Sequence, residues 1–65
     1  MTMMRSMEIE GKKFDLTVRE QPSQDNWHWI ISAPGELVLS GEAVTEMQAM
    51  LSACRAGRAF ARLVA

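Results

Sequence analysis

The sequence has few of the residues that build covalent or metal cross-links. Its 65 residues include one cysteine, Cys54, and one histidine, His28. One cysteine excludes a disulfide within the chain, and two soft ligands fall short of the roughly four that a structural zinc site needs. A core of this size rarely supplies more than about 3–5 kcal/mol without such support. The sequence therefore predicts an efficient core, a second subunit, or both.

Long apolar runs are also missing, because the longest is far shorter than the roughly 18–20 residues of a transmembrane helix. The first ten residues lack the apolar stretch of a signal peptide. With its single unpaired thiol, the protein is expected in the cytoplasm and away from membranes. Hydrophobic residues make up 48% and charged residues 23%, which is typical of a globular domain. We predict one domain over residues 7–65, preceded by a disordered tail over residues 1–6.

Motifs for catalysis and cofactor binding are absent from the sequence. There is no phosphate loop, dinucleotide fingerprint, metal-ligand spacing or nucleophile elbow. His28 has no recognisable catalytic partner and is interpreted as a solvated strand residue, while Cys54 is interpreted as a small hydrophobe in a helix. We therefore expect a non-enzymatic protein that uses no cofactor and no metal.

What the sequence does contain is a set of strand patterns. Apolar and polar residues alternate over 13–19 with the period of two that a half-buried strand shows. Met7 and Ile9 either extend this strand upstream or form a partner strand folded back at Glu10–Gly11. The polar segment over residues 20–26 favours a loop, which separates this strand from the next.

The segment WHWIIS predicts a second strand, because aromatic and β-branched residues favour the sheet. Alternation puts Trp27, Trp29 and Ile31 on one face. His28 and Ile30 lie on the other face, so both faces are partly apolar, as in a central or interface strand. The Trp face is either core beneath a helix or a surface for a partner.

A turn at residues 33–36 joins this strand to a third, since Pro34 suits the first central position of a β-turn and Gly35 the second. Residues 37–39 form the third strand, which is predicted to stop at Ser40–Gly41. The sequence thus predicts an α+β fold: a three-stranded antiparallel sheet, in the order β-β-β-α, with the C-terminal helix packed on one face.

The helix is predicted to begin after Thr45, which has the spacing of a capping box with Gln48. At 3.6 residues per turn, one apolar stripe is expected to close over the sheet. Its members are Met47, Met50, Leu51, Cys54 and Ala61. Gly57 either ends the helix or lies within it, and we favour a continuous or kinked helix because good helix formers follow.

The segment from Trp27 to Cys54 contains W-H-W, Gly35–Glu36 and Ser40–Gly41–Glu42, followed by the helix predicted after Thr45. In these motifs it resembles the YegP-like family of small bacterial domains. The sequence departs from the family pattern at Ala43–Val44 and lacks the usual lysine after the helix start. The family has no known biochemical function and is associated with paired or tandem units. The resemblance implies the fold and self-association, and carries over no catalytic residue.

Charge is unevenly distributed, although the net charge is only −1. Residues 8–46 carry eight acids and three bases, a net −5, and residues 47–65 carry three bases and no acid, a net +3. The three bases are Arg55, Arg58 and Arg62, which share one side of a continuous helix. They form either a solvated or internally paired face, or a row that grips an acidic partner or a nucleic-acid backbone.

Two functional hypotheses follow. The first, which we prefer, is an interaction module that pairs with a second copy or another protein through a strand edge or the second face of WHWII. The second is a nucleic-acid-associated or regulatory protein, of phage or mobile-element type, that uses the arginines. The candidate interaction residues are Trp27, His28, Trp29, Ile30, Arg55, Arg58 and Arg62.

Overall fold

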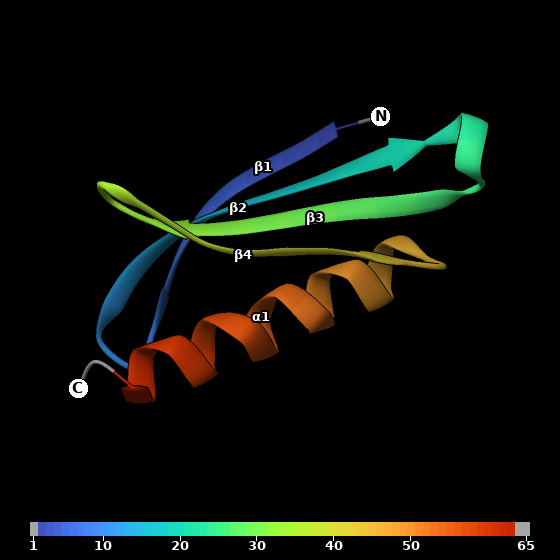
Figure 1. Ribbon diagram of the computed structural model, residues 1–65. Coiled ribbons are helices and arrows are strands. Elements are labelled where there is room, and N and C mark those ends of the chain that lie inside the picture. The colour runs from blue at the N-terminus through green and yellow to red at the C-terminus, as the bar shows by residue number, and fades with distance from the viewer. Residues whose placement is uncertain (1, 64–65) are drawn as a thin grey trace.

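The computed structural model describes residues 2–63, without the side chains of residues 37 and 38. A four-stranded antiparallel sheet is followed by one helix, which covers one face of the sheet (Figure 1). The strands lie side by side in chain order: β1 (Thr2–Ile9), β2 (Lys12–Gln21), β3 (Asn26–Ala33) and β4 (Glu36–Ala43). The helix α1 spans Glu46–Leu63, and a 3₁₀ turn, Pro22–Gln24, joins β2 to β3. The α+β class and the packed C-terminal helix are confirmed, and the prediction of three strands is wrong.

The additional strand is β1, which folds back on β2 at Glu10–Gly11. These two residues have φ of 51° and 83°, and a two-residue type I′ hairpin requires positive φ at both. Residues 2–6, predicted as a tail, form the first part of β1, while Met1 and residues 64–65 lie outside the described residues. Alternation does not reveal this strand, because Arg5 lies on the core side opposite Leu16 and Met4 on the open side.

The β3–β4 hairpin turns at Pro34–Gly35, as predicted, with Gly35 at φ 82°. β4 is longer than expected and continues through Gly41 to Ala43. Gly41 lies opposite Trp29, and a Cβ at position 41 would be 2.7 Å from Cζ2 of the indole. The glycine therefore makes room for a large side chain on the neighbouring strand and does not end β4.

The helix begins and continues as predicted. The backbone N–H of Gln48 donates a hydrogen bond to Oγ1 of Thr45 (3.1 Å), which satisfies one of the donors left free at the first turn. The helix then runs without interruption through Gly57 to Leu63. Gly57 is buried against the sheet, where a Cβ would lie 2.7 Å from Cδ1 of Ile31 and 2.8 Å from Cδ1 of Ile9.

The face of α1 that meets the sheet contains only Ala61 of the predicted stripe. The residues buried there are small and recur every four positions: Ala49, Ala53, Gly57 and Ala61. Two members of the predicted stripe, Met47 and Leu51, are 71% and 57% exposed. Met50 and Cys54 are half-buried at the border of the face that meets the sheet. These small side chains let the helix backbone lie close to the sheet, whose own side chains on this face are large. The fully buried large side chains all come from the sheet: Phe14, Leu16, Val18 and Ile31.

Candidate interaction surfaces

The WHWII segment forms β3 and divides between the two faces of the sheet as predicted. Trp29 is 9% exposed and packs in the core beside Gly41, and Trp27 is half-buried on the same side. The indoles therefore belong mainly to the layer between the sheet and α1. Their buried area stabilises a small domain strongly, since each aromatic side chain contributes about 150–250 Å².

His28 and Ile30 lie on the opposite face of the sheet, which α1 does not cover. Both are half-buried. Across the neighbouring strands, Ile30 lies between Thr17 and Ser40, and His28 lies in a row with charged residues of β2 and β4. Ile30 is thus an apolar residue in polar surroundings. Among the described side chains, the cross-strand neighbours of Ile30 on this face are polar, so they form no continuous apolar patch with it of the kind that marks a protein interface.

The three arginines are all exposed on α1, but their surroundings differ. Nε of Arg62 donates a hydrogen bond to Oε2 of Glu10 (2.9 Å), and this ion pair joins the last turn of the helix to the β1–β2 turn. Arg55 and Arg58 have no hydrogen bond or ion pair with any residue in the range 2–63. The predicted row therefore contains two unpaired guanidinium groups and one that is held internally.

The side of α1 that points away from the sheet has two halves. We call it the outer face, and its members are Met47, Leu51, Arg55, Arg58 and Arg62, all of them exposed. Its N-terminal half is apolar and its C-terminal half is basic. Met47 and Leu51 are absent from the predicted interaction residues. One sequence signal could have identified them: the small residues Ala49, Ala53, Gly57 and Ala61 recur every four positions. Because these residues form the inner face of the helix, Met47 and Leu51 must lie on the outer face.

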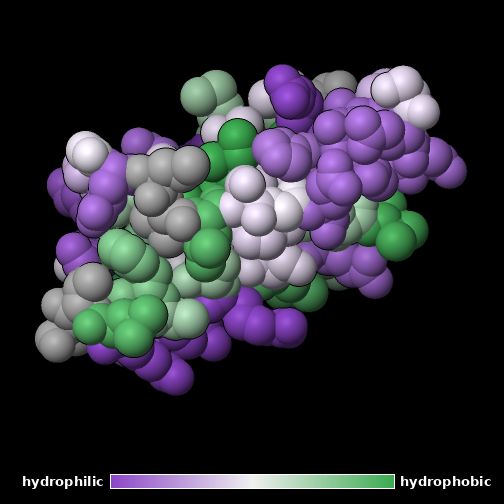
Figure 2. All heavy atoms as spheres, in the orientation of Figure 1, coloured by the Kyte–Doolittle hydropathy of each residue, from purple (hydrophilic) through white to green (hydrophobic). Residues whose placement is uncertain are grey.

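A second surface follows the outer edge of β4. β4 is the last strand of the sheet, and within the described residues no strand pairs with its outer side. Leu39, on the helix side of this edge, is 47% exposed, and Leu63 near the end of α1 is 83% exposed. Figure 2 shows hydrophobic surface gathering toward the C-terminal end of α1, whereas the surface over the β2–β3 turn is hydrophilic.

A hollow of about 410 Å³ lies where the end of β4 meets the first half of α1. It is lined by Glu42, Ala43, Val44, Gln48, Leu51, Ser52 and Arg55. Val44 is 75% exposed at its rim. The hollow combines apolar side chains with an unpaired guanidinium, so it can accept an apolar group that lies next to a carboxylate.

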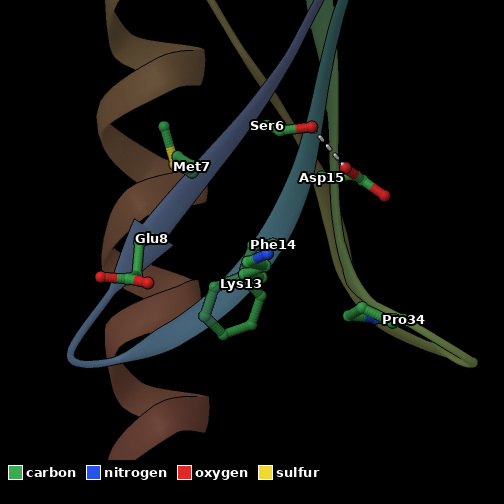
Figure 3. Close-up of a pocket in the computed structure, with 7 residues that line it drawn as sticks. All are labelled: Ser6, Met7, Glu8, Lys13, Phe14, Asp15 and Pro34. Atoms are coloured by element: carbon green, nitrogen blue, oxygen red, sulfur yellow. Dashed lines mark hydrogen bonds between the residues drawn. The ribbon is translucent and has the colours of Figure 1, made fainter.

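Another hollow, of about 420 Å³, lies where the β1–β2 hairpin diverges from the β3–β4 turn (Figure 3). Pairing between β2 and β3 reaches only as far as Asp15 and Ser32, so Pro34 faces the hollow from a separate hairpin. The hydroxyl of Ser6 donates a hydrogen bond to Oδ1 of Asp15 (3.0 Å). Glu8 and Lys13 are cross-strand neighbours beside this pair. The four polar side chains here are all exposed.

No family model, curated protein or solved structure matches the chain. Among residues 2–63, no group of three or more His, Cys, Asp or Glu side chains is placed to hold a metal ion. Within the same residues, no helix combines the length and the hydrophobicity needed to cross a membrane.

Proposed function

We propose that this protein is a non-enzymatic interaction module that self-associates through the free edge of β4. The observation that carries the proposal is this edge, because its unpaired backbone groups lie beside exposed apolar side chains. A free strand edge is a template for a strand from another chain. Self-association is also what the resemblance to the YegP-like family implies, because that family is associated with paired units.

The flank of α1 next to β4 suits a second copy. Gln48 and Ser52 lie beside the end of β4, and residues on the same side of the helix follow at intervals of three and four. These residues are Ala56, Ala59 and Leu63, two small residues and one that is 83% exposed. If two copies pair antiparallel along β4, the sheets join into one and the small side chains let the two helices lie close together.

The opposite edge, β1, is less suited to strand addition. Arg5 lies on its helix side opposite the buried Leu16, and a charge that points toward the core layer is a common protection of an edge strand. α1 lies mainly over β3 and β4 and least over β1, so a copy added at β1 would meet little helix surface. On β4 the bulge at Val38 leaves residues 39–43 as the regular part of the edge.

Sedimentation velocity over a range of concentrations tests the proposal. We expect a monomer–dimer equilibrium, and a Leu39→Asp variant with a dissociation constant raised at least about tenfold, because a carboxylate would be buried against the second copy. Leu63→Asp, on the helix, should also raise the dissociation constant. The matched control is Met4→Asp, since Met4 is 77% exposed on the other edge strand.

Circular dichroism establishes that each variant is folded before the comparison. A strict monomer at the highest attainable concentration would contradict the proposal. So would a dimer that Met4→Asp dissociates and Leu39→Asp and Leu63→Asp leave intact, because the interface would then lie at β1.

A further inference from the structure

The outer face of α1 carries features that the fold does not use. Met47 and Leu51 are four positions apart, and both are more than half exposed. Arg55 and Arg58 continue the same side of the helix, so the basic groups begin about 6 Å further along the axis at about 1.5 Å per residue. Arg55 lines the hollow beside Val44 and Leu51, and the one carboxylate there, Glu42, accepts a hydrogen bond from Nε2 of Gln21 (3.2 Å). An apolar anchor point and two cationic groups are therefore presented together.

The charge of this face identifies what can cover it. From Met47 onward the sequence has three bases and no acid, and Arg55 and Arg58 have no partner among residues 2–63. The α1 helix of a second copy would bring the same arginines, and its one carboxylate, Glu46, lies on the inner side of the helix, three positions before Ala49. A complementary partner must therefore supply acidic side chains of its own, arranged next to apolar ones.

We propose that the outer face of α1 binds an acidic amphipathic helix of another protein. Apolar side chains of that helix pack on Met47 and Leu51 and enter the hollow at Val44. Its carboxylates, one to two turns further along, form bidentate pairs with Arg55 and Arg58. Helix packing favours this geometry, because side chains three and four positions apart form ridges that fit between those of a second helix. The outer face shares no residue with the flank proposed for self-association, and only its hollow reaches the end of β4. The inference therefore does not depend on self-association.

The probe is a fluorescein-labelled peptide of about 20 residues, designed to be helical, with leucines on one face and glutamates along both borders of that face. Fluorescence anisotropy at low salt measures its binding to the full chain. Two peptides serve as comparisons: one of the same composition with the pattern scrambled, and one with every glutamate replaced by lysine. We expect binding of the acidic patterned peptide alone, weakening as salt rises.

Variants assign the binding to the outer face. We expect Leu51→Asp to abolish binding and an Arg55→Ala/Arg58→Ala double variant to raise the dissociation constant about tenfold. The matched controls are Met4→Asp and Arg19→Ala, an exposed apolar residue and an exposed arginine elsewhere on the sheet, which should leave binding unchanged. The arginine variants change only exposed side chains, so they remain informative if Leu51→Asp does not fold.

Four results would overturn the inference. The first is absence of binding at low salt. The second is equal binding of the scrambled or lysine peptide, or binding that the outer-face variants do not weaken. The third is tighter binding of a single-stranded oligonucleotide with the same dependence on Arg55 and Arg58, which would assign the face to nucleic acid. The fourth is a loss of self-association in Leu51→Asp that Leu39→Asp and Leu63→Asp do not show. That result would assign the outer face to a second copy.

Discussion

At the scale of single residues, the contact between Gly41 and Trp29 shows how one glycine can have a purely steric role. A glycine within a strand is ordinarily less favourable than alanine by about 0.5–1 kcal/mol, since its backbone loses more freedom on folding. Here a methyl group would lie 2.7 Å from Cζ2 and 2.9 Å from Cε2 of an indole that is 9% exposed. The indole is rigid and surrounded by the core, so it cannot move aside freely.

We therefore expect Gly41→Ala to lower the free energy of unfolding by about 1–3 kcal/mol, the usual cost of overpacking a core. Urea denaturation followed by tryptophan fluorescence measures it. Ser40→Ala is the control, because Ser40 is exposed and lies on the other face of the same strand. A Gly41→Ala variant as stable as the native chain would show that Trp29 can repack.

At the scale of elements, the packing of α1 on the sheet depends on the small residues of its inner face. Gly57 is the closest point of approach, with Ile31 and Ile9 beneath it. We expect Gly57→Leu to destabilise the fold by about 3 kcal/mol or more, because the added side chain has no space between helix and sheet. Thermal unfolding measures the effect. Arg58→Leu, at an exposed position on the outer face of the same helix, should change stability by less than about 0.5 kcal/mol.

The elements also differ in how far the sequence alone predicts them. The Pro34–Gly35 turn, the alternation in β2 and the Thr45 cap are local features, and the structure confirms each. The inner face of α1 is not predicted, because the helix has apolar residues around most of its circumference. Hydrophobicity favours the face with Met47 and Leu51, whereas the space above Ile31 admits only the face with alanines and Gly57.

At the scale of the whole molecule, β1 decides whether the sheet has three strands or four. Its first residues pair with β2 from Thr2 opposite Arg19 to Ser6 opposite Asp15. Met3 is half-buried and packs against the core. A chain that begins at Met7 would lose this pairing and this contact, and would expose the edge of β2.

We expect the chain beginning at Met7 to be less stable by about 2 kcal/mol, which lowers Tm by roughly 10 °C for a domain of this size. Thermal unfolding followed by circular dichroism measures the change. The control is the full chain with alanine at Thr2, Met4 and Ser6, whose exposed side chains can be truncated while the backbone pairing remains. An unchanged Tm in the shortened chain would contradict a structural role for residues 2–6.

The sequence by itself determined the α+β class, the strand–turn–strand path from Trp27 to Leu39 and the start of the helix, because these depend on neighbours within a few residues. It also located the arginines on one helix. Only the tertiary structure decided that α1 turns its alanines inward, that Arg62 is paired with Glu10, and that Leu39 lies on a free edge. The physical reason is that these outcomes depend on which surfaces fit together across the sheet, a property of shape that periodicity along the chain does not record.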